Sequence, residues 1–172
     1  SRLLKKGVKL ENLPFEIIAH DPASSDVFVA IHGYAESPRG IKPAAEFISK
    51  QGDNVVAVLL TGHGSKPEDL DAATANQWRR DVYQAALRAR KYGKRVFFVA
   101  HSLGAAIAVN VAKRHPGLFS GGFAISPGLP HSPSLEAYLN SRAEKGFRFS
   151  SDEPIKNSYS YPFASIKGFK TA

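Results

Sequence analysis

The chain has 172 residues, 43% of them hydrophobic, and a net charge of +8 at neutral pH. This length and composition predict one globular domain with a sizeable core. Cysteine is absent, which excludes disulfides and thiolate metal sites. The lysines and arginines are scattered in pairs and form no continuous basic face, so we expect a solvated surface and no nucleic-acid partner.

The longest apolar runs have the length of a strand, well below the ~20 residues that cross a bilayer. Residues 1–6 are basic, but the apolar stretch of a signal peptide does not follow them. We therefore expect no integral membrane segment and a soluble protein, with the cytoplasm slightly favoured. A weak contact with a membrane surface or a lipid stays open. Methionine is also absent, which agrees with a processed or partial chain.

In chain order, strand-like apolar runs alternate with longer helical patterns. Strands are predicted at residues 15–19, 27–31, 55–60, 96–100 and 122–126, and helices at residues 38–50, 76–92 and 103–115. A polar loop with Gly62, Gly64 and Pro67 follows residue 60. Asn76 and Gly93 are candidate caps of the second helix. The alternation predicts the α/β class, with a mostly parallel, doubly wound sheet.

The composition changes after residue 126, where proline, serine and glycine become frequent. We expect residues 1–126 to form the N-terminal part of a core. Residues 127–172 are expected to begin a cap, or lid, inserted over the carboxyl edge of the sheet, with a helix at 135–145. Four aromatic residues near the end either line a pocket under this cap or simply pack it onto the core: Tyr159, Tyr161, Phe163 and Phe169.

Ser102 lies where a predicted buried strand runs into the next helix, in the sequence Ala-His-Ser-Leu-Gly. A nucleophile elbow needs this strand–turn–helix context, with small residues two positions before and after the serine. Ala100 and Gly104 meet that need. The helix that starts at Leu103 directs its N–H groups toward the serine, which favours an oxyanion. We predict that Ser102 is a nucleophile; the alternative is a serine that only caps the helix.

His32, Gly33 and Tyr34 follow the predicted strand at residues 27–31. In a doubly wound sheet this loop reaches the same carboxyl edge as Ser102. Gly33 allows the backbone to pass close to a substrate. We predict that the backbone N–H groups of Tyr34 and Leu103 form an oxyanion hole. The alternative is an ordinary turn at the end of a strand.

Three motifs in this order and spacing, His32-Gly33, Gly62-His63-Gly64 and residues 100–104, resemble those of the serine α/β-hydrolases in the carboxylesterase, monoacylglycerol lipase and lysophospholipase group. The resemblance covers roughly residues 26–126. It implies the α/β-hydrolase fold and hydrolysis of small-molecule carboxylic esters with lipid-like or short acyl groups, through an acyl-enzyme, without metal or organic cofactor. A thioesterase, a peptidase or another acyl-transfer enzyme of the same fold is the alternative, as is a non-catalytic hydrolase-like module.

The α/β-hydrolase fold orders its triad as serine, then acid, then histidine. His63 precedes Ser102, so we expect it to be structural. His101 is adjacent to Ser102 in the chain, and we expect that its ring cannot reach the hydroxyl as a base.

The later candidates for the triad are His131, Asp152 and Glu153. The histidine precedes both acids, which is the wrong order, so we assign none of them. We expect the acid and histidine beyond Ala172. A chain that ends there is expected to be nearly inactive by itself, because a serine hydroxyl needs a general base.

Overall fold

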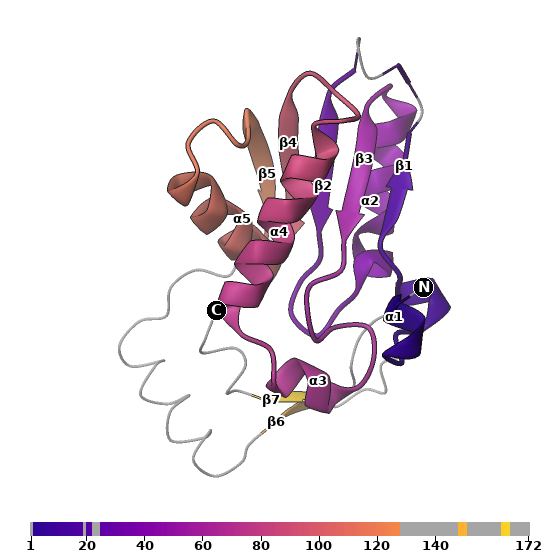
Figure 1. Cartoon of the computed structure of the whole chain (residues 1–172), viewed down its shortest axis with the longest axis vertical. Helices are drawn as coiled ribbons and strands as arrows, with labels where there is room; N and C mark the ends of the chain where they lie inside the picture. Colours follow the sequence, from indigo (N-terminus) through magenta and orange to yellow (C-terminus); the bar gives the residue numbers. More distant parts are fainter. Residues whose placement is uncertain (1, 19, 22–24, 128–147, 151–162, 166–172) are drawn as a thin grey trace.

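The computed structural model describes residues 2–18, 20–21, 25–127, 148–150 and 163–165. Its centre is a five-stranded sheet in the order β1-β3-β2-β4-β5 (Figure 1). The strands are β1 (Phe15–Ile17), β2 (Val27–Ile31), β3 (Asn54–Val58), β4 (Val96–His101) and β5 (Gly121–Ile125). β1 pairs antiparallel with β3, and the other pairings are parallel. The predicted mostly parallel sheet is confirmed.

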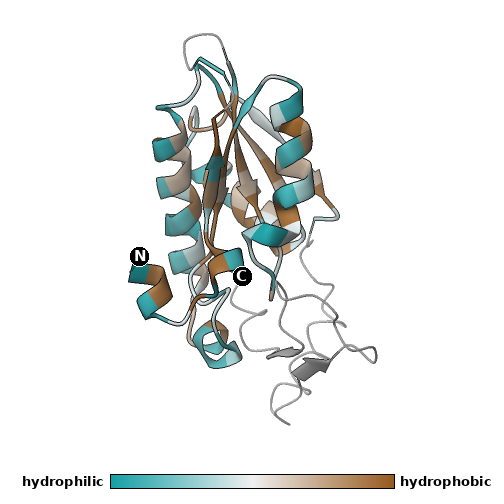
Figure 2. Ribbon diagram, turned by 90° about the vertical axis from the view of Figure 1, so that its right-hand side faces the viewer, coloured by the Kyte–Doolittle hydropathy of each residue, from teal (hydrophilic) through white to brown (hydrophobic). Residues whose placement is uncertain are grey.

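Helices cover both faces of this sheet, as predicted for a doubly wound fold. On one face, α2 (Pro38–Lys50) packs against alternate residues of the strands, including Phe28 and Val55. On the other face, α4 (Ala75–Ala89) and α5 (Leu103–Arg114) pack against the intervening residues, including Val29. Figure 2 shows apolar residues concentrated on the strands and on the helix sides that face them.

Short elements lie outside the central layers. They are α1 (Arg2–Lys5), a 3-10 helix (Leu10–Asn12), α3 (Pro67–Asp71) and a two-stranded antiparallel pair of β6 (Arg148–Ser150) and β7 (Phe163–Ser165). β7 lies beside α3 (Figure 1). Within the described residues, no helix combines the length and the apolar character needed to cross a membrane.

The α4 helix begins and ends differently from the prediction. Thr74 caps it, because its hydroxyl accepts from the N–H of Gln77 at 3.3 Å while the Gln77 side chain accepts from the N–H of Thr74 at 2.8 Å. The predicted cap at Asn76 is therefore wrong. The helix ends at Ala89, so Gly93 does not end it either. Gly93 instead lies in close contact with the backbone of the segment before β2. A Cβ added to Gly93 would be 2.9 Å from the carbonyl oxygen of Ser25.

Other boundaries shift by a few residues. The first strand ends at Ile17, the strand predicted at 55–60 is Asn54–Val58, and α3 lies within the segment predicted as a polar loop. The last strand of the series is largely exposed, because β5 is at the edge of the described sheet. The division into a core at 1–126 and a cap at 127–172 stays a prediction. The helix expected at 135–145 lies outside the described residues, as do Tyr159, Tyr161 and Phe169.

Candidate active site

The carboxyl ends of β2, β4 and β5 bring the predicted site residues to one edge of the sheet. Ile31 pairs with Ala100, so the chain leaves β2 and β4 at the same level. His101, the last residue of β4, pairs with Ile125. The loop that follows β2 therefore passes directly beside the turn that contains Ser102.

Ser102 forms a sharp turn between β4 and α5, with φ +48° and ψ −117°. A positive φ is uncommon for a residue other than glycine and carries strain. Backbone hydrogen bonds hold the turn. The N–H of Ser102 donates to the Ile125 carbonyl at 2.9 Å, and the Ser102 carbonyl accepts from the N–H groups of Ala105 at 3.1 Å and Ala106 at 3.3 Å. The half-buried side chain makes no capping bond to α5, so the alternative of a capping serine is wrong.

Small residues flank the turn for a steric reason. A Cβ added to Gly104 would overlap the carbonyl oxygen of His32 and would lie 2.9 Å from that of Ile31. Ala100 is completely buried in β4. The start of α5 therefore packs directly on the backbone at the end of β2, which is the close contact that the small residues of an elbow permit.

Gly104→Ala is expected to lower the free energy of unfolding by about 3 kcal/mol, at the upper end for overpacking, because the clash is with backbone atoms that no rotamer change relieves. Urea denaturation followed by circular dichroism measures this. Gly121→Ala is the matched control, because its Cβ would meet the Phe97 ring at an ordinary 3.4 Å. Equal effects of the two substitutions would contradict the packing argument.

His32 connects the loop after β2 to the loop after β3. It is fully buried; its Nδ1 lies 2.8 Å from the Gly33 carbonyl oxygen, and its Nε2 accepts from the N–H of Leu60 at 3.1 Å. A backbone N–H can only donate, so Nδ1 carries the proton of a neutral ring. Burial, followed by the nearby His63, lowers the pKa of His32 to about 3. His32 is therefore a fixed donor to the backbone at neutral pH.

This bond also fixes the orientation of Tyr34. The carbonyl of Gly33 and the N–H of Tyr34 belong to one trans peptide unit, in which they point in opposite directions. By holding the Gly33 carbonyl, His32 sets the direction of the Tyr34 N–H, which is the predicted oxyanion donor. Leu103 is the first residue of α5, where a backbone N–H has no acceptor within the helix.

His63 is buried beside this loop, and its contacts are those of a structural residue rather than of a general base. Its ring is 4.8 Å from that of His32 and 5.8 Å from that of Trp78, measured between centroids. Burial lowers the pKa of His63 to about 4, and its Nδ1 lies 3.3 Å from the Thr61 carbonyl oxygen. These contacts agree with the structural role predicted for His63.

Two side chains of α4 hold the loop after β3. The indole N–H of Trp78 donates to the Thr61 carbonyl at 2.8 Å, and Asp81 accepts from the Thr61 N–H at 2.7 Å. Burial raises the pKa of the Asp81 carboxyl, although the bonds from Thr61 oppose this shift. The sequence alone did not predict a role for Asp81, although its position one turn after Trp78 on the same helix face is a signal of one.

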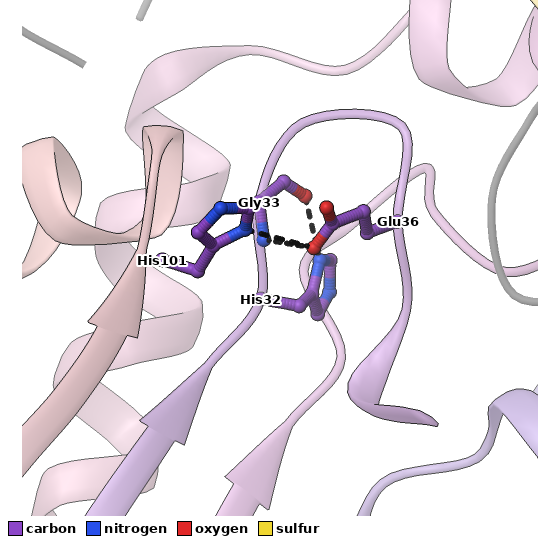
Figure 3. A network of polar contacts seen from close by, with 4 residues as sticks. All are labelled: His32, Gly33, Glu36 and His101. Carbon is purple, nitrogen blue, oxygen red and sulfur yellow. Dashed lines mark hydrogen bonds and ion pairs between the residues drawn. The ribbon is translucent and has the colours of Figure 1, made fainter. Parts of the chain in front are cut away.

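Glu36 is a second residue whose role the sequence alone did not predict. Its Oε2 accepts from the Gly33 N–H at 3.0 Å and lies 3.2 Å from Nδ1 of His101, which precedes Ser102 (Figure 3). A Cβ added to Gly33 would lie 3.0 Å from the same His101 nitrogen, so a larger residue there would require the His101 or Glu36 side chain to shift. The structure thus brings His32, Gly33 and His101 together, as predicted, and adds a carboxylate between them.

The Ser102 hydroxyl has no hydrogen bond to a histidine or carboxylate within the part of the chain that the structure describes. The later triad candidates, His131, Asp152 and Glu153, lie outside that part. Among the described residues, no group of three or more histidine or acidic side chains is placed to hold a metal ion.

Comparisons with known proteins match this architecture. A family model described as "Serine aminopeptidase, S33" matches residues 22–153. The thermostable monoacylglycerol lipase of Bacillus sp. (strain H-257) is 28% identical over 86 residues, which are 50% of this chain and 34% of that protein. The chain thus spans about a third of the length of this curated relative.

Solved structures show the same fold. A metagenome-derived lipolytic enzyme from the study of LipS and LipT is 26% identical with a TM-score of 0.78, over 95% of this chain and 67% of that one. The monoacylglycerol lipase of Paleococcus ferrophilus is 18% identical with a TM-score of 0.66, over 92% and 70%. A soluble variant of the monoglyceride lipase of Saccharomyces cerevisiae is 14% identical with a TM-score of 0.71, over 92% and 62%. The chain therefore belongs to the serine α/β-hydrolases, in the family described as serine aminopeptidase S33, and has the α/β-hydrolase fold.

Proposed function

We propose that the protein hydrolyses small-molecule carboxylic esters with lipid-like or short acyl groups, through an acyl-enzyme on Ser102. The observation that carries this proposal is the strained turn at Ser102, whose hydroxyl is not used to cap the helix that follows it. The similarity to monoacylglycerol lipases and a lipolytic enzyme supports an ester as the substrate.

In the proposed mechanism, the Ser102 oxygen attacks the carbonyl carbon of the ester while a histidine takes the hydroxyl proton. The N–H groups of Leu103 and Tyr34 donate to the developing oxyanion, and one such donor is typically worth about 10²–10³ in rate. The histidine then protonates the departing alcohol, and water releases the acid from the serine. We propose that this histidine and its acid partner come from outside the described residues.

Labelling of the full-length protein with a fluorophosphonate, followed by peptide mass spectrometry, tests the assignment. We expect phosphonylation at Ser102 and none in Ser102→Ala. Ser120→Ala is the matched control, because Ser120 is exposed and precedes β5 at the opposite end of the sheet, and it should label normally. A folded protein that does not label would instead support a non-catalytic hydrolase-like module.

The description of the family model names an aminopeptidase, so the test must also distinguish esters from amides. We expect p-nitrophenyl esters of graded chain length to be hydrolysed faster than an aminoacyl p-nitroanilide or an acyl thioester of the same acyl group. Preference for the anilide or for the thioester would replace the esterase proposal with a peptidase or thioesterase on the same serine.

A further inference from the structure

Glu36 lies between the two backbone segments that the proposed mechanism needs. It belongs to the loop after β2, and its carboxylate reaches His101, 65 positions later in the chain, at the end of β4 (Figure 3). The side chain is half-buried and bonds to the loop's own backbone at the Gly33 N–H. One oxygen atom, Oε2, makes both contacts.

The two contacts act on the two halves of the proposed oxyanion hole. Gly33 immediately precedes Tyr34, so the bond to its N–H holds the loop that presents the Tyr34 donor. His101 immediately precedes Ser102, and Leu103 follows, so the contact to its ring holds the turn that presents the other donor. Gly33 is thereby fixed at both polar groups, with its N–H on Glu36 and its carbonyl on His32.

We propose that Glu36 is a positioning residue that holds the loop after β2 and the Ser102 turn at a fixed separation, and so aligns the two donors of the oxyanion hole. This inference rests on the proposed function for its catalytic consequence. Glu36 acts through backbone and through His101, and no contact with the substrate is required of it. Because its role is that of an acceptor, a neutral amide at this position should preserve most of it.

Kinetics of three variants of the full-length protein test this role. Glu36→Ala is expected to lower kcat for a short p-nitrophenyl ester by about 10- to 100-fold with KM nearly unchanged, because misplaced donors lose transition-state stabilisation rather than binding. Glu36→Gln keeps an acceptor, so its kcat should be no more than about fivefold below that of the wild type. Glu46→Ala is the matched control, since Glu46 is an exposed carboxylate that pairs with Lys42 on α2, and it should stay within about twofold of wild type.

A double variant tests the connection to His101. If Glu36 acts on the Ser102 turn through that ring, adding His101→Ala to Glu36→Ala should lower kcat by no more than about twofold further. A raised KM with unchanged kcat, a Glu36→Gln variant as slow as Glu36→Ala, or fully multiplicative losses in the double variant would overturn the proposal. Concentrations are set by titrating the reactive serine, so a loss of folded protein does not count as a loss of kcat.

A second measurement needs no activity. In a ¹H–¹⁵N spectrum, Glu36→Ala should shift the amide resonances of Gly33, Tyr34 and Leu103, while Glu46→Ala should leave them in place. Unchanged resonances at Gly33 would overturn the proposed contact. Because this result does not depend on hydrolysis, a protein that fails to cleave any ester would overturn the proposed function while the spectrum still decides the role of Glu36.

Discussion

Ser102→Ala in the full-length protein is expected to lower kcat for a short p-nitrophenyl ester by at least about 10⁴-fold, because removal of a triad nucleophile leaves only donor contacts and binding. KM should change little, since the pocket is untouched. A second substitution, Ser102→Gly, should be equally inactive but more stable than Ser102→Ala by about 1 kcal/mol, because glycine adopts a positive φ without strain. Steady-state kinetics and urea denaturation measure the two effects on the same preparations.

This pair of variants separates chemistry from backbone strain. The φ of +48° at Ser102 predicts a gain in stability only for glycine, whereas the loss of the hydroxyl predicts inactivity for both. Ser120→Ala controls for a general effect of removing a serine hydroxyl and should keep full activity. If Ser102→Ala retained more than about a hundredth of the wild-type kcat, the assignment of the nucleophile would be wrong.

Acidification is expected to lower the free energy of unfolding by about 3 kcal/mol per pH unit between pH ~6 and ~4. His32 and His63 are neutral in the folded protein, with pKa values lowered by burial to about 3 and about 4. In the unfolded chain both rings bind protons below their ordinary pKa of 6.5. The unfolded state then holds more protons, so stability is complete above that pKa and is lost as the pH falls. Below pH ~4 His63 is protonated in both states and the slope decreases.

Asp81 opposes this trend, because burial raises the pKa of its carboxyl and the folded protein takes up that proton first. Urea denaturation at half-unit intervals of pH measures the net slope. His63→Asn should roughly halve it, to about 1.4 kcal/mol per pH unit. His115→Asn, at an exposed ring on the end of α5, should preserve the full slope. A stability that does not change between pH ~6 and ~4 would show that the two buried rings do not resist protonation.

The sequence predicts much of this site because its parts are local. A buried strand, a serine with small neighbours and a helix occur within a few consecutive residues around Ser102. The parallel order of the strands then places the loop after β2 beside that turn. These inferences need only periodicity, side-chain size and the rule that parallel strands end at one edge.

The contacts that the sequence did not reveal are those between distant segments. Glu36 meets His101 only because β2 and β4 pair in one register, and no local pattern indicates which charged residue of a loop turns inward. Asp81 meets Thr61 because α4 packs beside β3 and the loop that follows it, which is again a contact between distant segments. The capping box at Thr74 and Gln77 is different, because its pattern is present in the sequence, beginning two positions before the expected helix, and could have been recognised.

The exposed edge at β5 has a practical consequence for handling the protein. In the described part of the chain β5 pairs only with β4, and two of its apolar side chains, Phe123 and Ile125, are 64% and 42% exposed. An unpaired strand edge with apolar side chains is a template onto which a second chain can add by backbone hydrogen bonding, the usual start of precipitation. A fragment trimmed to residues 1–127 would therefore tend to precipitate at high concentration, which matters for expression trials, antibody production and crystallisation.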